Sequence, residues 1–170
     1  NAAHELQTPI TGIIHRLQLL LDEGSLTEKD ANSINNALDS AGRMARLNKD
    51  LLLLTKIENF QFKEVEKVDI EQIFRLGVED LVDFASFKKI EFRFTIEDIF
   101  EIEMNRSLCQ ILVNNLLKNA IVHGDGGKII EIVIEANLFS VCNQSKEIPL
   151  DKYKIFDRFY KGSDSSVHSG

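Results

Sequence analysis

The sequence has no tryptophan, only two cysteines, no excess of basic residues and no long hydrophobic run. Cys109 and Cys142 lie in separate apolar stretches and form no Cys-x-x-Cys pair, which argues against a disulfide framework and favours a reducing compartment. The net charge of −7 provides little attraction for phosphate backbones, so we expect no nucleic-acid partner. No apolar run approaches the roughly 18 to 20 residues that cross a bilayer, and no signal peptide is recognisable.

The residues that are present fit a folded globular protein. Hydrophobic residues make up 44% and charged residues 28% of the chain, which argues against disorder. Eleven phenylalanines can supply the aromatic core that tryptophan does not. The 170 residues suffice for one ordinary domain or two small ones. Because the chain begins inside a helical pattern without methionine, we expect it to be a piece of a longer protein.

The first sixty residues have the apolar spacing of two helices. The first seam recurs every three or four residues, as in a heptad repeat. It consists of Leu6, Ile10, Ile13, Leu17 and Leu20. A polar break follows, and a second helix is predicted from about Thr27, its capping residue, to Glu58. A lone antiparallel hairpin would leave one side of its seam in water, so the pattern predicts a homodimeric four-helix bundle.

The remainder alternates between helical and strand patterns. Residues 59–68 are polar and predict a linker. Helical spacing covers 70–84, and Asn105 is the expected N-cap of a helix over 106–123. Strict alternation predicts strands. These strands lie at 90–96, 130–134 and 138–142, and a short helix is expected at 152–161.

The run AHELQTPI near the start of the chain carries candidate chemistry. His4 falls at an outward heptad position, where an imidazole would be exposed and nucleophilic when neutral. Glu5 could take its proton, and Thr8 lies one turn further on the same face. Pro9 removes a hydrogen bond and costs a helix about 3 kcal/mol. The alternative is an incidental surface histidine on a helix that contains proline.

This run resembles the H-box of bacterial sensor histidine kinases, commonly His-Glu-Leu-Arg-Thr-Pro-Leu, with Gln7 and Ile10 as the departures. The resemblance implies that His4 accepts the γ-phosphoryl group of ATP and that Glu5 assists as a base. It also implies that Thr8 orients a water molecule when the partner response regulator is dephosphorylated.

A polar stripe interrupts the predicted helix over 106–123. Asn115, Asn119 and His123 recur every four residues, and amide oxygens suit Mg²⁺ when phosphate and water complete its shell. The alternative is a solvated helix face. The run NNLLKNAIVHG resembles the N-box of the same kinases. This resemblance implies that Asn119 holds Mg²⁺, that Asn115 contacts phosphate or metal-bound water, and that His123 lies beside the nucleotide. Val122 is a departure, because it replaces the usual Lys or Arg.

Two later runs continue the resemblance. Residues 141–149 occupy the place of the G1 box, where Asn143 stands for the usual Asp that accepts from the adenine amino group, and both glycines are replaced. An amide still accepts a hydrogen bond, but without the charge that strengthens it. Residues 155–162 resemble the F-box, in which Lys161 would approach the γ-phosphate. The alternative interpretation of its two phenylalanines, Phe156 and Phe159, is that they are ordinary core residues.

Together these motifs predict an α+β fold in two domains. Residues 1–60 would form the dimerisation and phosphotransfer hairpin, and residues 65–170 an α/β-sandwich ATP-binding domain of the histidine-kinase type, truncated before the glycine-rich G2 box. The expected reaction is ATP-dependent phosphorylation of His4 and transfer to an aspartate of a response regulator, with an additional phosphatase activity. The expected location is the cytoplasmic portion of an inner-membrane sensor whose membrane segment lies outside this chain.

Two alternative functions also fit the sequence. The altered G1 box would fit a kinase-inactive phosphatase or signalling scaffold with the same fold. A coiled-coil interaction module with an incidental His4 would account for the hairpin alone.

Overall fold

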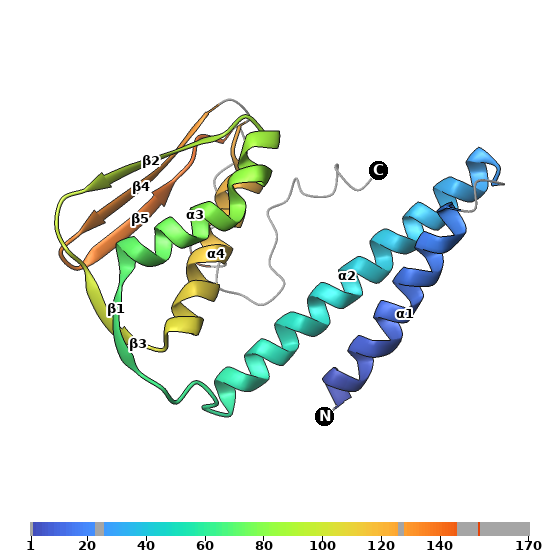
Figure 1. The fold of residues 1–170 in the computed structure, drawn as a ribbon, viewed down its shortest axis with the longest axis horizontal. Coiled ribbons are helices and arrows are strands. Elements are labelled where there is room, and N and C mark those ends of the chain that lie inside the picture. Colours follow the sequence, from blue (N-terminus) through green and yellow to red (C-terminus); the bar gives the residue numbers. More distant parts are fainter. Residues whose placement is uncertain (1, 23–25, 126–127, 146–152, 154–170) are drawn as a thin grey trace. The chain divides into compact units, whose positions relative to one another are not determined.

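The chain forms two compact units, Asn1–Lys63 and Glu64–Gly170. The computed structural model describes residues 2–22, 26–125, 128–145 and 153, with side chains described from Glu5 onward. The first unit is a helical hairpin and the second combines helices with strands, as Figure 1 shows. The predicted order of a helical hairpin followed by an α/β unit is therefore confirmed.

The hairpin consists of helices α1 (Ala2–Asp22) and α2 (Glu28–Glu58), which lie side by side (Figure 1). Thr27 caps α2 as predicted: its hydroxyl oxygen accepts from the Asp30 amide at 3.3 Å and donates to the Asp30 carboxylate at 2.6 Å. Such caps satisfy amides that have no partner within the helix. The long second helix therefore begins at a locally specified residue.

Two apolar stripes run along the hairpin, and only one of them is covered. The inner stripe packs between the helices and includes buried Ile10 and Ala41 with half-buried Leu17 and Leu38. The outer stripe is 38% to 58% exposed and comprises Leu6, Ile13, Leu20, Met44, Leu47, Leu51 and Leu54. The single predicted seam of α1 thus divides between the two stripes, because spacing alone does not say which neighbour covers a residue.

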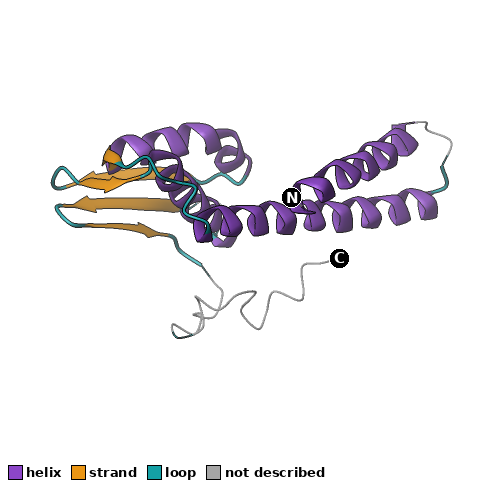
Figure 2. Cartoon of the chain, turned by 90° about the horizontal axis from the view of Figure 1, so that it is seen from below, coloured by secondary structure: helices purple, strands orange, loops and turns teal. Residues whose placement is uncertain are grey.

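The described residues of the second unit form two small sheets. Strands β1 (Glu66–Asp69) and β3 (Glu101–Met104) pair antiparallel. Strands β2 (Glu91–Ile96), β4 (Ile129–Glu135) and β5 (Leu138–Cys142) form the other sheet in the order β2-β4-β5, with β2 parallel and β5 antiparallel to β4. Helices α3 (Ile70–Phe87) and α4 (Arg106–His123) cover one face of this sheet (Figure 2).

The prediction of a linker over residues 59–68 is wrong for the C-terminal part of that range. Strand β1 begins at Glu66, and Val68 is fully buried against the core. Neither β1 nor its partner β3 was expected, because four-residue strands are too short for a periodic signal. Helix α3 continues three residues past its predicted end, to Phe87. The helix predicted at 152–161 lies outside the described residues.

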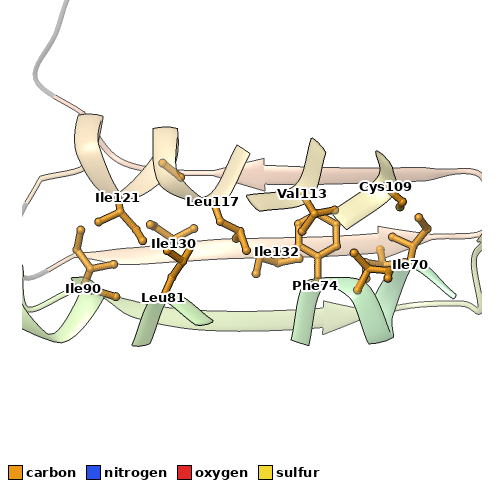
Figure 3. Close-up of a cluster of buried hydrophobic side chains, with 14 of the residues drawn as sticks. Ile70, Phe74, Leu81, Ile90, Cys109, Val113, Leu117, Ile121, Ile130 and Ile132 are labelled. Carbon is orange, nitrogen blue, oxygen red and sulfur yellow. The ribbon is translucent and has the colours of Figure 1, made fainter. Parts of the chain in front are cut away.

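The core of the second unit forms where α3, α4 and β4 meet (Figure 3). Alternate residues of β4 point toward the helices, and the ring of Phe74 meets that of Phe139 edge-on at 5.2 Å. Gly77 lets the two helices approach closely, since a Cβ there would lie 2.7 Å from Asn114 Oδ1 and 2.9 Å from Leu117 Cδ1. The fully buried members are Val68, Ile70, Ile73, Phe74, Cys109, Val113, Leu117, Ile121, Ile130, Ile132 and Ile134. This core fixes which face of α4 points outward.

Candidate functional site

The candidate phosphoacceptor segment occupies the first turns of α1. His4 lies in this helix, and its side chain is outside the described part of the chain. Glu5 and Thr8 are exposed and lie three residues apart, so they share a face of the helix. Pro9 lies inside α1 and supplies no amide for the carbonyl of Glu5. The segment is thus helical up to and through its proline.

The outward face of α4 carries the predicted nucleotide-contacting residues. Asn115, Asn119 and His123 are all exposed and follow one another at single-turn intervals. Two aliphatic residues flank them, Leu112 at 45% and Val122 at 49% exposure. A polar stripe edged by exposed aliphatic side chains can offer both polar contacts and an apolar surface to a ligand.

The turn after α4 is joined to the segment after β5. The Asp125 amide donates to the Gln144 carbonyl at 2.8 Å. The end of α4, with His123, is therefore connected to the residue that follows half-buried Asn143. These two parts of the predicted site come together, whereas Lys161 and the rest of the predicted F-box lie outside the described residues.

Gly124 permits this close turn. A Cβ at Gly124 would lie 2.6 Å from the carbonyl oxygen of Ala120, a backbone atom of α4. We expect Gly124→Ala to destabilise the second unit by about 1 to 3 kcal/mol, because the turn or the helix end must shift to make room. Scanning calorimetry should show its transition lowered by at least about 4 °C. Gly12→Ala on α1, where a Cβ would meet nothing within 4 Å, should not lower stability; an unchanged transition in Gly124→Ala would contradict the expectation.

The chemistry of the donors on α4 limits what the site can hold. Among the described residues, no group of three or more His, Cys, Asp or Glu could hold a metal ion. An exposed amide such as that of Asn119 fits Mg²⁺ when phosphate and water oxygens supply the other ligands. Cys109 is on the buried face of α4, and burial raises the pKa of its thiol despite the nearby charge of Arg106. It is therefore no candidate nucleophile.

Some contacts at this site have no signal in the sequence. The Lys88 ammonium donates to the carbonyls of Ile121 and Val122, more than thirty residues away. The bond between Asp125 and Gln144 is likewise made by segments that come together only in the fold. No spacing rule identifies such pairs, since both depend on how α3, α4 and β5 pack.

No helix within the described ranges has both the length and the apolar character to cross a membrane.

Two family models match the chain in succession. Residues 1–60 match the His Kinase A (phospho-acceptor) domain. Residues 104–170 match the histidine kinase-, DNA gyrase B-, and HSP90-like ATPase family. The first match contains the hairpin segment with His4, and the second contains α4 and the turn that follows it.

Curated relatives are similar along the whole chain. The heme sensor protein HssS of Staphylococcus epidermidis is 28% identical over 187 residues, covering 100% of this chain. HssS of Staphylococcus aureus is 28% identical over 179 residues, also covering 100%. The chain spans 38% of the length of these relatives.

Solved structures share the fold. Histidine kinase ThkA in complex with response regulator protein TrrA matches with a TM-score of 0.60 and 26% identity, covering 94% of this chain and 49% of that one. The histidine kinase AdeS of Acinetobacter baumannii matches with a TM-score of 0.60 and 23% identity, covering 91% and 78%. The cytoplasmic segment of histidine kinase QseC matches with a TM-score of 0.51 and 27% identity, covering 61% and 70%.

Proposed function

The chain belongs to the sensor histidine kinases, and we propose that it phosphorylates its own His4 from ATP and passes the phosphoryl group to an aspartate of a response regulator. One observation carries the proposal: a phosphoacceptor match and an ATPase match fall on two separate compact units in this order. The solved complex of ThkA with TrrA supports a receiver domain as the partner. We further propose a homodimer, which the exposed outer stripe of the hairpin supports. We also propose a cytoplasmic location, which the similarity to the cytoplasmic segment of QseC supports.

The phosphotransfer step needs one nucleophile and one proton acceptor. A ring nitrogen of neutral His4 attacks the γ-phosphorus in line, a nitrogen–phosphorus bond forms, and the bond to the leaving oxygen of ADP breaks. Glu5, the adjacent residue on α1, takes the proton that the imidazole gives up. Thr8 orients the water molecule that hydrolyses the phosphoaspartate of the regulator, which releases inorganic phosphate. Catalysis by such a site rests on positioning and charge neutralisation rather than on covalent chemistry.

The nucleotide is assigned to the outward face of α4 and the turn after it. The Asn119 amide oxygen would bind Mg²⁺, which neutralises phosphate charge when it is present. Asn115 contacts phosphate or metal-bound water. His123 would lie beside the base and Asn143 would accept from the adenine amino group. Lys161, outside the described residues, is the proposed contact of the γ-phosphate.

Calorimetry with ATP in the presence of Mg²⁺ tests the nucleotide site. We expect Asn119→Ala to weaken binding about tenfold or more, because the metal loses a protein oxygen and the phosphates lose their link to α4. Asn36→Ala is the matched control, since it places alanine for asparagine on an exposed helix face of the hairpin. Asn119→Ala should also remove most of the difference between affinities measured with and without Mg²⁺.

Two outcomes would count against the assignment. If Asn119→Ala binds ATP as the unmodified chain does, Asn119 is not the metal ligand. If the longest protein encoded around this chain binds no ATP at millimolar concentration, the kinase reaction fails and a phosphatase or scaffold of the same fold takes its place. Asn143, where the family has a carboxylate, is the feature that favours this second candidate.

A further inference from the structure

Among the described residues, helix α4 has no capping turn of its own at its C-terminal end. Its C-cap residue, Gly124, is extended, with φ −77° and ψ 147°, rather than left-handed. The last carbonyls of any helix have no amide partner within it, and a left-handed glycine turn commonly supplies one. In α4 the donor comes from elsewhere in the fold: the Lys88 ammonium lies 3.2 Å from the Ile121 oxygen and 3.1 Å from the Val122 oxygen.

The end of α3 places Lys88 for this contact. Lys89 has a φ of 56°, in the left-handed region that residues other than glycine rarely adopt. The Lys89 amide donates to the Ser86 carbonyl and the Ile90 amide to the Ala85 carbonyl, both at 2.9 Å. This pair of bonds is the Schellman turn. Buried Ile90 anchors the turn in the core, so Lys88 is held at its base.

Charge and burial favour the same arrangement. The carbonyl end of a helix carries partial negative charge, which an ammonium group complements. Lys88 is half-buried, and its bond to the Ile121 carbonyl is partly shielded from water, which strengthens a charged hydrogen bond. The contact joins the ends of the two helices that cover the sheet.

We propose that Lys88 is a positioning residue for the nucleotide site. By holding the last turn of α4 it fixes the backbone that leads to His123 and to the Asp125 amide, which binds the carbonyl of Gln144 next to Asn143. Lys88 acts through this backbone and needs no contact with the ligand. The inference deepens the proposed function and rests on it for the identity of the ligand.

The test compares three variants of the longest protein encoded around this chain. Lys88→Met keeps the length of the side chain and removes its donors, whereas Lys88→Arg retains charged donors. Lys89→Met is the matched control, because it removes the same charge from the neighbouring position. Amide hydrogen exchange is measured at Asp125 and at Ile132 in the middle of β4, and affinity for ATP with Mg²⁺ is measured by calorimetry.

We expect Lys88→Met to speed exchange of the Asp125 amide about tenfold, with little change at Ile132, and to weaken ATP binding about fivefold. Lys88→Arg keeps charged donors and should therefore lie within about twofold of the unmodified protein in both measurements. Lys89→Met should match the unmodified protein as well. A merely structural role would raise exchange at both amides together. That result, or unchanged exchange at Asp125 in Lys88→Met, would overturn the proposal.

Two further outcomes separate this inference from the proposed function. If Lys88→Met loses protection at Asp125 but binds ATP with full affinity, Lys88 is a cap alone and the positioning role is wrong. If the unmodified protein binds no ATP, the proposed function fails on its own account. The exchange rates then decide whether Lys88 holds the turn.

Discussion

Replacing Leu47 and Leu51 together by glutamate should convert the proposed homodimer to a monomer. Both side chains belong to the outer stripe of the hairpin, and they are 54% and 55% exposed. Burying a leucine contributes about 1.5 to 3 kcal/mol, and a two-fold interface counts each substitution twice. Four glutamates would also have to be desolvated together. The dissociation constant should therefore rise by more than about a thousandfold.

Sedimentation and light scattering across a concentration series measure this change. Lys49→Glu is the matched control, because it alters the net charge by the same two units at an exposed position of α2 outside both stripes. Circular dichroism should show α2 still helical in both variants. A double leucine variant that remains dimeric, or an unmodified chain that sediments as a monomer at high concentration, would show that the outer stripe serves another purpose.

Local interactions explain which parts of the fold were predictable. Thr27 and Asn105 cap their helices through contacts three residues away, so the printed sequence contains both partners of each bond. The alternation of isoleucines in β4 likewise reports directly which side faces the helices. Such elements need no knowledge of the rest of the chain.

Nonlocal interactions explain what was missed. Glu66–Asp69 resembles a charged linker, and only its pairing with β3 some thirty residues later makes it a strand. The apolar residues of α1 have one period but serve two surfaces, and only the position of α2 separates Ile10 from Ile13. Burial of a residue is thus decided by partners that periodicity does not identify.

The candidate site divides in the same way. The spacing of Asn115 and Asn119 predicts that they share one face of a helix. In the structure both side chains are exposed on the outward face of α4. What lies beside that face depends on the bond from Asp125 to Gln144 and on Lys88 at the helix end. Sequence motifs therefore identified the residues that would bind a ligand, whereas packing determines the position of the backbone that carries them.

Substituting His4 by glutamine should remove all phosphorylation of the chain by ATP. A phosphorylated histidine has a nitrogen–phosphorus bond, so the label from γ-³²P-ATP should be labile to acid and stable to base. Glutamine retains polarity and similar length but has no nucleophilic nitrogen, and therefore leaves no acceptor. Incorporation should fall to background, at least about a hundredfold below the unmodified protein. Glu5→Gln should slow labelling by about a hundredfold or more while leaving ATP binding unchanged.

His15→Gln provides the matched control, because His15 is an exposed histidine further along the same helix and undergoes the same substitution. The assay should use the longest protein encoded around this chain, so that failure to label is not attributed to residues left out. Label that persists in His4→Gln, or that survives acid, would place the acceptor elsewhere. A protein that binds ATP but never labels His4 would instead be a phosphatase or scaffold. If it neither labels nor binds ATP yet dimerises through the outer stripe, the hairpin is an interaction module in which His4 is incidental, because only the apolar contacts would then have a measured role.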